Sequence, residues 1–305
     1  MKMSKRPGYI RLYETGELFE RIKKLNTMLS DCALCPRDCR SNRLRGHRGY
    51  CRTGDLPMVS SAHPHFGEEP PLTGTAGSGT IFMTHCNLEC VYCQNHEVSQ
   101  GGDGETVTEE ELSAMMVSLQ KKGCHNINFV TPTHQVPQIV ESLPKAIENG
   151  LDVPLVYNCA GYEEVPTLKL IEGIFDIYMP DIKYGDDKTA ERLSSARRYF
   201  DVARAAVREM HRQVGDLTID ERGVAQKGLI IRHLVLPNGL AGTRKVMRFI
   251  AKEISPDTYV NLMRQYQPCF MAVKHADISR PVTDAEFAEA LEAARGEGLT
   301  RIVGA

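Results

Sequence analysis

Residues 80–95 read Thr80-Ile-Phe-Met-Thr-His-Cys86-Asn-Leu-Glu-Cys90-Val-Tyr-Cys93-Gln-Asn95. A β-like run over residues 80–84 leads directly into three cysteines with the spacing Cys-x3-Cys-x2-Cys. Three thiolates on one loop can surround a single inorganic centre, and thiolates select zinc, copper(I) or iron-sulfur clusters over magnesium and calcium. The stretch therefore predicts a metal-binding loop at the end of a strand.

The same spacing favours a 4Fe-4S cluster over zinc. Electron-carrying 4Fe-4S proteins mostly supply four cysteines, but the nearest others here, Cys51 and Cys124, are distant in sequence. One iron would then lack a protein ligand, and an open position distinguishes a reactive metal site from a closed structural one. The alternative is a Cys3His zinc site closed by His96. Zinc signatures usually contain two ligand pairs separated by a longer spacer, which this loop lacks.

A second cysteine group precedes the first, with the pattern Cys32-x2-Cys35-x3-Cys39-x11-Cys51. Four soft ligands within twenty residues can hold zinc or a second cluster, and zinc is slightly favoured. Six arginines are interspersed with these cysteines: Arg37, Arg40, Arg43, Arg45, Arg48 and Arg52. We interpret them as offsetting the negative charge of the thiolates. A basic patch for an acidic partner or RNA is the alternative.

Composition limits the classes of function. The chain has 305 residues, a net charge of -2 and ten cysteines. This charge argues against a general binder of nucleic acid or membranes, and no apolar run reaches the roughly 18 residues of a membrane span. The start lacks the apolar region of a signal peptide, so we expect a cytoplasmic protein in which cysteines bind metal rather than form disulfides. Cys124, Cys159 and Cys269 are isolated, and we expect small buried or free thiols there.

Strand-like and helix-like segments alternate after residue 73. Strands are predicted at residues 80–84, 127–131, 153–158, 174–182, 229–236 and 259–263. Helices are predicted at residues 15–30 and 188–214, and two more start at the capping boxes Thr108 with Glu111 and Thr283 with Glu286. Such alternation predicts an α/β fold with a parallel sheet, here a partial (β/α)6 TIM-like barrel over residues 73–305. Residues 1–72 are expected to form an N-terminal helix and a four-cysteine metal-binding extension.

The Cys86-x3-Cys90-x2-Cys93 motif, with the aromatic Tyr92 and with Asn95 behind it, resembles the signature of the radical S-adenosylmethionine (SAM) superfamily. The chain resembles more narrowly the homologues of pyruvate formate-lyase activating enzyme, in a branch with a cysteine-rich amino end. This resemblance implies a (β/α)6 partial barrel of the radical SAM type, and a 4Fe-4S cluster on Cys86, Cys90 and Cys93.

The resemblance also implies which residues meet the cofactor. An Asp-x-Lys at a strand end contacts the ribose and carboxylate region of SAM in activating enzymes, and Asp181 and Lys183 match it. Residues two apart on a strand share a face, so these two side chains should lie together. Four further positions match residues near the cofactor: Tyr92, Asn95, Asn158, where an aspartate is usual, and Arg232.

One departure concerns the second predicted strand. The family usually has Gly-Gly-Glu there to hold the amino group of SAM, whereas this chain has Thr131-Pro-Thr-His134. Thr131, Thr133 or His134 could accept a hydrogen bond, but none carries a carboxylate charge. The amine contact is therefore unassigned.

The resemblance implies an enzyme that reductively cleaves SAM to a 5'-deoxyadenosyl radical and abstracts a hydrogen atom from a protein or peptide, as in activation of a glycyl radical enzyme. A reductant such as flavodoxin or ferredoxin would supply the electron. The alternative function is a non-catalytic zinc-binding interaction or RNA-binding module with two cysteine-rich sites.

Overall fold

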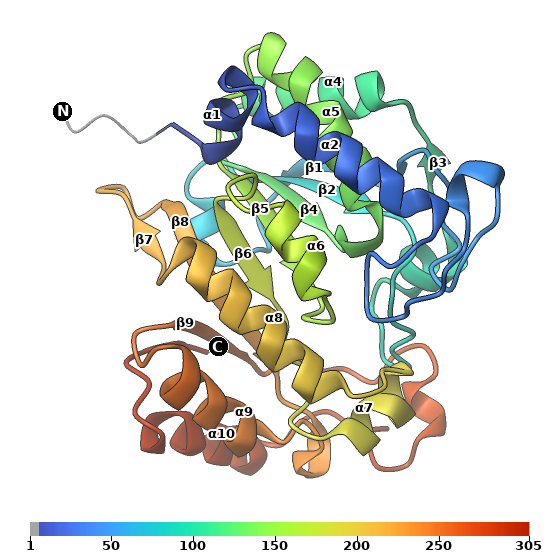
Figure 1. The fold of residues 1–305 in the computed structure, drawn as a ribbon. Coiled ribbons are helices and arrows are strands. Elements are labelled where there is room, and N and C mark those ends of the chain that lie inside the picture. Colours follow the sequence, from blue (N-terminus) through green and yellow to red (C-terminus); the bar gives the residue numbers. More distant parts are fainter. Residues whose placement is uncertain (1–5, 305) are drawn as a thin grey trace.

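A ten-stranded sheet forms the centre of the computed structural model, which describes residues 6–304 (Figure 1). The strand order is β10-β9-β8-β6-β5-β4-β2-β1-β3, and β7 pairs with β8 at the side. The strands are β1 (Met58–His65), β2 (Ser78–Met83), β3 (Glu105–Thr106), β4 (Ile127–Val130), β5 (Leu155–Cys159), β6 (Ile177–Pro180), β7 (Thr218–Ile219), β8 (Ala225–Leu234), β9 (Tyr259–Met263) and β10 (Arg301–Val303).

The sheet is mostly parallel and open. Strands β2, β4, β5, β6, β8, β9 and β10 run parallel, while β1, β3 and β7 pair antiparallel. The path ends at β10 on one side and β3 on the other, so the barrel does not close. All six predicted strands are present, as β2, β4, β5, β6, β8 and β9. The prediction of an α/β partial barrel is confirmed, and β1 and β10 extend the sheet beyond those six strands.

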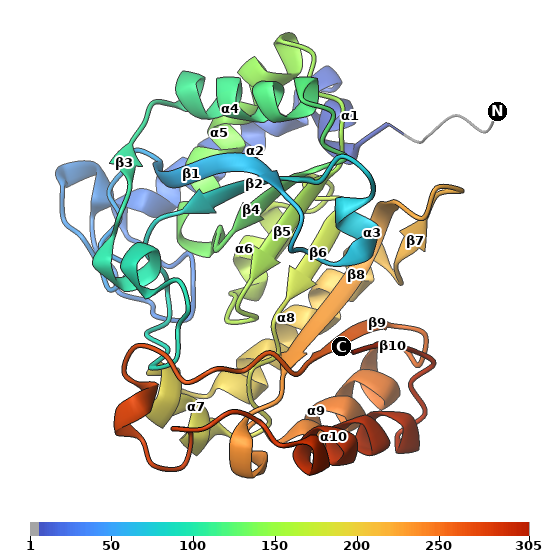
Figure 2. The same cartoon turned by 180° about the vertical axis from the view of Figure 1, so that it is seen from behind.

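Most helices cover the outer face of the sheet, whereas the short helix α3 lies on the inner face, where its Leu72 packs with Val156. Figure 2 shows β5, β6 and β8 from the opposite side, in front of α8. The inner face is therefore the side on which polar residues can meet a ligand. The helices are α1 (Gly8–Glu14), α2 (Glu17–Thr27), α3 (Pro70–Thr73), α4 (Glu109–Lys121), α5 (Val136–Glu148), α6 (Val165–Leu170), α7 (Asp187–Ser194), α8 (Tyr199–Val214), α9 (Thr243–Phe249) and α10 (Asp284–Gly296).

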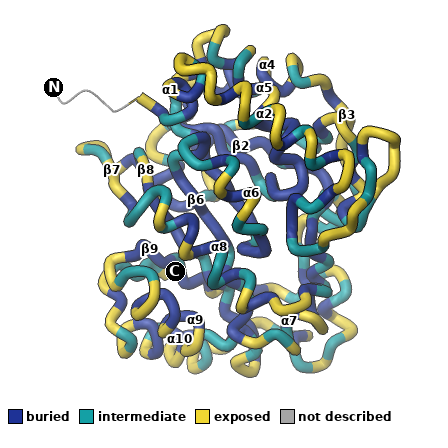
Figure 3. The backbone as a smooth tube through the Cα atoms, in the orientation of Figure 1, coloured by how far each residue is buried: buried dark blue, intermediate teal, exposed yellow. Residues whose placement is uncertain are grey.

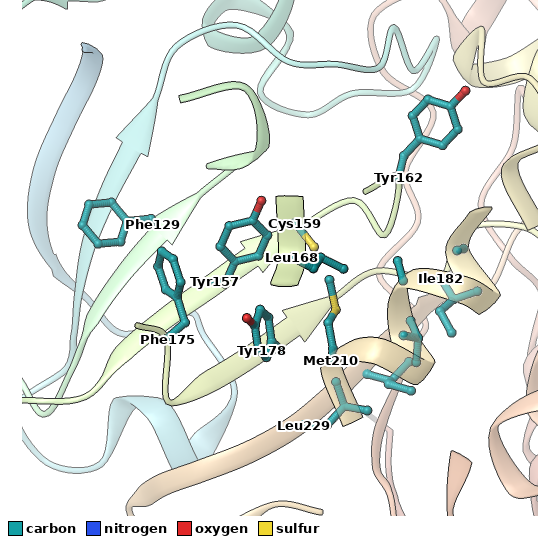
Figure 4. Close-up of a cluster of buried hydrophobic side chains, with 14 of the residues drawn as sticks. Phe129, Tyr157, Cys159, Tyr162, Leu168, Phe175, Tyr178, Ile182, Met210 and Leu229 are labelled. Atoms are coloured by element: carbon teal, nitrogen blue, oxygen red, sulfur yellow. The ribbon is translucent and has the colours of Figure 1, made fainter. Parts of the chain in front are cut away.

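Alternation along the strands separates two cores. Phe129 and Tyr157 point outward and pack edge-to-face with Phe175, and Tyr178 packs edge-to-face with Tyr157 (Figure 4). A smaller inner cluster contains Val156, Ile177, Met179 and Ile230 of the strands together with Leu72 of α3. The central strands β2, β4, β5 and β6 are almost wholly buried (Figure 3), so their register is fixed by which side chains must face each core.

The predicted helix over residues 188–214 is two helices, and that prediction is corrected. Helix α7 ends at Ser194 and α8 begins at Tyr199, with Ser195 and Arg198 at φ of 52° between them. The predicted helix over residues 15–30 is α2 followed by a 3-10 turn at Met28–Ser30. Thr108 and Thr283 cap α4 and α10 through complete capping boxes, as predicted.

The amino-terminal part lies against the barrel. Helix α2 packs on α5 and α6, and β1 pairs with β2 in the central sheet. The division at residue 72 stays a prediction, although β1 is hydrogen bonded into the sheet that follows it. Within the described residues, no helix combines the length and apolar character that a membrane span requires.

Candidate active site

The three cysteines of the predicted metal loop follow β2 at the carboxyl edge of the parallel strands. Each sulfur has a polar neighbour. The backbone N–H of Leu88 donates to Cys86 Sγ at 3.3 Å, Ser194 Oγ donates to Cys90 Sγ at 3.0 Å, and Ser99 Oγ lies 3.1 Å from Cys93 Sγ. Hydrogen bonds to thiolate sulfurs are a usual feature of iron-sulfur sites. The loop therefore presents three thiols with protein hydrogen-bond partners at the functional edge of the barrel.

The donor set fits a multi-iron cluster better than a single zinc ion. The loop supplies three cysteine sulfurs, which are the soft donors that iron-sulfur clusters take. A cluster places each cysteine on a different iron, so its thiolates stand further apart than those around zinc. His96, the alternative fourth zinc ligand, stacks on the ring of Phe270 with 4.5 Å between centroids. Cys86, Cys90 and Cys93 would hold the cluster, which would supply electron transfer and an open iron.

Tyr92 and Asn95 occupy different environments in this loop. Tyr92 is buried, and its hydroxyl donates to the Tyr184 hydroxyl at 2.6 Å. Tyr184 in turn contacts Ser194 Oγ at 2.6 Å, so this chain of hydroxyls leads to the Cys90 sulfur. Asn95 is exposed, and its carbonyl accepts from Ser99 N–H at 2.8 Å. Both residues support the loop, and their contact with a cofactor stays a prediction.

Asp181 and Lys183 lie together beyond the end of β6, as their spacing predicted. Lys183 Nζ donates to Asp181 Oδ2 at 2.7 Å, and Arg232 Nε of β8 donates to Asp181 Oδ1 at 2.7 Å. Arg232 Nη2 also donates to Asn158 Oδ1 of β5 at 2.8 Å. The structure thus brings together four of the six predicted cofactor residues: Asn158, Asp181, Lys183 and Arg232.

Charge pairing controls the ionisation of this network. Burial alone would raise the pKa of Asp181, but Arg232 and Lys183 outweigh it and lower the pKa to about 2. Burial would lower the pKa of Lys183, yet the Asp181 carboxylate and the nearby Cys90 raise it. Lys183 is therefore a fixed cation beside the metal loop, where it can meet a carboxylate or a sulfur ligand.

The residues that replace Gly-Gly-Glu are already hydrogen bonded within the protein. Thr133 Oγ1 donates to Glu163 at 2.7 Å, and His134 Nε2 lies 2.8 Å from the Thr84 carbonyl. Burial lowers the pKa of His134 to about 3, so its imidazole is neutral near pH 7. Thr131 adopts a φ of 59° at the strand end. The amine contact stays unassigned.

Sequence reasoning missed Glu163, a fully buried carboxyl after β5. It accepts hydrogen bonds from Thr133 Oγ1 and, at 2.9 Å, from the Tyr157 hydroxyl. Burial raises its pKa to about 7 despite these bonds. An acidic residue four positions after a buried strand was the available signal, because that place is the functional edge of a barrel.

The missed residues also include a group on the inner face, Glu68 and Glu69 with His65. His65 Nδ1 lies 3.2 Å from Glu68 Oε1, and Arg232 Nη1 lies 3.5 Å from Glu68 Oε2. The sequence offered little signal, since adjacent glutamates before a proline are typical of an exposed turn. Their burial depends on β1, an antiparallel strand that the alternation of strands and helices did not predict.

The four-cysteine region lies against the metal loop. Cys32, Cys35 and Cys51 are buried and Cys39 is exposed. Burial raises the pKa of Cys35, and the nearby Cys51 and Cys32 raise it further, so these thiols are neighbours. Cys51 and Cys86 line one small cavity between the two cysteine groups.

The arginines of this region mostly bind the protein itself. Arg37 Nε donates to the Asn87 carbonyl at 2.7 Å. Arg43 is buried and donates to the carbonyls of Gly54 and His134, each at 2.7 Å. Arg40 pairs with two exposed carboxylates, those of Asp31 and Asp38. Arg40, Arg45, Arg48 and Arg52 are exposed, so part of the basic run that was the alternative interpretation faces solvent.

Comparison with known proteins agrees with this geometry. Residues 80–221, which span the metal loop and the first strands of the barrel, match the model of the radical SAM superfamily. The uncharacterized protein MJ0674 of Methanocaldococcus jannaschii is 32% identical over 291 residues, which cover 92% of this chain and 79% of that protein. The chain belongs to the radical SAM superfamily.

Several solved structures resemble the fold. Native anSMEcpe with bound AdoMet and Cp18Cys peptide is 12% identical with a TM-score of 0.48, over 72% of this chain and 60% of that one. HydG, a maturase of the [FeFe]-hydrogenase, is 15% identical with a TM-score of 0.49, over 74% and 50%. Methylornithine synthase (PylB) is 15% identical with a TM-score of 0.48, over 74% and 70%. The chain thus spans less than two thirds of the length of anSMEcpe and of HydG.

Proposed function

We propose that this protein reductively cleaves SAM at a 4Fe-4S cluster held by Cys86, Cys90 and Cys93. One electron from a reductant such as flavodoxin or ferredoxin breaks the bond between sulfur and the 5' carbon, which gives methionine and a 5'-deoxyadenosyl radical. The radical takes a hydrogen atom from the substrate and becomes 5'-deoxyadenosine. The observation that supports this most directly is the placement of the Lys183–Asp181 pair beside Cys86 and Cys90 of the metal loop.

Substitution of one thiol tests this proposal. We expect Cys90→Ala to abolish formation of 5'-deoxyadenosine by the anaerobically reconstituted full chain with dithionite. Cys124→Ala is the matched control, since Cys124 is buried far from the loop with its sulfur near the Ala76 carbonyl. A Cys90→Ala protein that still cleaves SAM at the wild-type rate would overturn the ligand assignment.

We propose a protein or peptide as the hydrogen donor, in line with the resemblance to activating enzymes of glycyl radical enzymes. The inner face of the open sheet supports this, because its edge strands leave the barrel unclosed. Deuterium transfer from Cα-deuterated glycine peptides into 5'-deoxyadenosine tests it. Transfer only from small molecules would contradict a peptide substrate.

At Cys32, Cys35, Cys39 and Cys51 we propose a zinc site, with a second iron-sulfur cluster as the alternative. Neighbouring buried thiols support a metal there, and iron, sulfide and zinc analysis of anaerobically purified protein separates the two. A colourless protein with two zinc ions per chain would instead support a non-catalytic interaction or RNA-binding module. The internal use of Arg37 and Arg43 disfavours RNA binding.

We propose that the protein acts in the cytoplasm. All ten cysteines lie within the described residues and none forms a disulfide. Unpaired thiols and a cluster of this kind suit a reducing compartment. Cell fractionation tests this, with recovery in an exported fraction as the contradicting result.

A further inference from the structure

Two carboxylates reach the inner face of the sheet from the segment between β1 and α3. The side chains of Glu68 and Glu69 are only 6% and 3% exposed. Glu68 Oε1 lies 3.2 Å from His65 Nδ1, and Asn261 Nδ2 of β9 donates to Glu69 Oε1 at 3.1 Å. Each carboxylate is thus anchored through one oxygen.

The remaining contact of this pair is with Arg232, which is already engaged elsewhere. Its Nε and Nη2 atoms donate to Asp181 and Asn158 at 2.7 and 2.8 Å. Its Nη1 atom lies 3.5 Å from Glu68 Oε2 and 3.8 Å from Glu69 Oε1, which is longer than a hydrogen bond. Apart from His65 beside Glu68, the pair therefore has no close ionic partner of its own among the described residues.

Formal charges at this site do not cancel. Asp181, Glu68 and Glu69 are three carboxylates, and with His65 counted as neutral they face two cations, Lys183 and Arg232. One negative charge is left in a buried setting, where charges are normally paired. Bound SAM would not remove this excess, since its sulfonium and carboxylate charges cancel when its amine is neutral. Burial also raises the pKa of Glu68, although Arg232 opposes this.

The second oxygens of both carboxylates lack a donor. Within residues 6–304, Glu68 Oε2 and Glu69 Oε2 are shielded from solvent and accept no hydrogen bond. The amide of Asn128 is likewise fully buried with both its oxygen and nitrogen unpartnered. Such groups are costly to bury unless a ligand or water completes them.

Asn128 borders the same interior as the glutamates. It is in register with Thr80 of β2 and Val156 of β5, and so shares their inner face. Val156 belongs to one packed cluster with Leu72, which lies three residues after Glu69. An independent unpartnered amide thus faces the region that the two carboxylates enter.

An aromatic wall lies beside the carboxylates. The ring of His63 stacks on Phe82 of β2 with 5.6 Å between centroids, and His65 meets Phe82 edge-on at 5.9 Å. His63 is exposed and the side chain of His65 is 35% exposed, so this aromatic wall borders solvent along β1. This wall suits the aliphatic stem that carries a charged group.

We propose that Glu68 and Glu69 bind a primary ammonium group of the substrate, such as that of a lysine-like side chain, with its aliphatic stem against Phe82 and His63. An ammonium carries one positive charge and three N–H donors, which match the one excess negative charge and the two free carboxylate oxygens. This inference rests on the proposed function, because it assigns the substrate class of the same site.

The probe for this proposal is n-butylammonium, with n-pentanol as a neutral analogue that is one heavy atom longer. We measure binding by saturation-transfer NMR to the cluster-reconstituted full chain with SAM present. Butylammonium is expected to bind at least tenfold more tightly than pentanol, and at least tenfold more weakly to Glu68→Gln/Glu69→Gln. The matched control is Glu109→Gln/Glu110→Gln, an adjacent pair in the first turn of α4, which should bind like wild type.

Three results would overturn the proposal: equal binding of pentanol, unchanged binding to the Glu68→Gln/Glu69→Gln variant, or loss of butylammonium binding when SAM saturates the protein. The last result would assign the pair to the amine of SAM itself. If the double variant does not fold by circular dichroism, the single variants and the comparison with pentanol decide. Failure of the proposed function appears separately, as absence of SAM cleavage by wild type.

Discussion

Lys183 Nζ lies 2.7 Å from Asp181 Oδ2, and both side chains are more than four-fifths buried. The Asp181 carboxylate also receives Arg232 Nε at the same distance, so it is the common counter-ion of two cations. Two cations that share one carboxylate depend on it, because neither has an equally close carboxylate elsewhere among the described residues. This relationship makes Asp181 the centre of the network at the strand ends.

Removal of that charge should destabilise the fold. Asp181→Asn leaves Lys183 and Arg232 buried without their counter-ion, and breaking a buried pair in this way costs roughly 3 kcal/mol. The free energy of unfolding of the apoprotein in urea measures this cost. Asp103→Asn is the control at an exposed position, and it should fall within 0.5 kcal/mol of wild type, as surface substitutions usually do. A similar loss in both variants would show that the network contributes no special stability.

The pKa of Glu163 predicts a pH dependence of stability. The folded state raises this pKa from 4.5 to about 7, chiefly by burial. The folded state therefore favours the protonated carboxyl over the ionised one. The contribution of Glu163 to the free energy of unfolding is full below about pH 4.5 and declines as pH rises through about 7. At 1.36 kcal/mol per pH unit, the decline amounts to about 3 kcal/mol.

Glu163→Gln tests whether the free energy of unfolding falls as pH rises, because glutamine does not titrate. The free energy of unfolding of wild type relative to Glu163→Gln should fall by about 3 kcal/mol from pH 4.5 to pH 8. Glu110→Gln, exposed on α4, should follow the wild-type profile. A wild-type protein that gains stability over Glu163→Gln as pH rises would contradict a raised pKa.

Local signals explain what could be predicted of this fold. The strand at residues 259–263 and the capping boxes at Thr108 and Thr283 were predicted correctly, because alternation and capping depend on neighbouring residues. The break between α7 and α8 was not predicted, since helical periodicity continues through it. There the carbonyls of Leu193 and Ser194 accept the N–H groups of Val91 and Glu89 in the metal loop, so tertiary contacts override the local pattern.

The contacts of the site also divide into those that sequence spacing predicts and those that the order of the strands sets. Asp181 and Lys183 are two residues apart, so their meeting was predicted from the alternation of side chains along a strand, although both lie just beyond the end of β6. Arg232 joins Asp181 from 51 residues away, and only the parallel order of β6 and β8 brings them together. The burial of Glu68 and Glu69 depends on the antiparallel strand β1, which the alternation of strands and helices did not predict. A contact set by topology rather than spacing was therefore found only where the family resemblance supplied it.

Arg37 links the four-cysteine region to the metal loop. Its Nε donates to the carbonyl of Asn87, which lies between Cys86 and Cys90, its Nη1 donates to the carbonyl of Ser195, and its guanidinium lies 3.7 Å from the ring centroid of Tyr50. Loss of these charge-assisted hydrogen bonds costs about 2 kcal/mol of local stability. Opening of the metal loop should then be roughly 30-fold more frequent.

The rate of iron release to a ferrous chelator measures this opening in the reconstituted protein. We expect faster release from Arg37→Ala and a wild-type rate from Arg48→Ala, whose side chain is exposed. Equal rates in the two variants would show that the amino-terminal region does not brace the loop.

A substitution at Gly49 tests whether Cys39 is a metal ligand or a free thiol. A Cβ atom at position 49 would lie 2.3 Å from Cys39 Sγ and 2.9 Å from Ser41 Oγ. A free thiol can rotate away from an added methyl group at little cost, whereas a sulfur held by a metal cannot move without leaving its ligand position.

Gly49→Ala should therefore lose the metal of the four-cysteine region and keep the iron of the Cys86 loop. Gly54→Ala is the matched control, because its Cβ would meet no atom within 4 Å. Metal analysis of the two purified variants decides: full occupancy in Gly49→Ala would exclude Cys39 from the ligand set and leave Cys32, Cys35 and Cys51 as a three-thiol site.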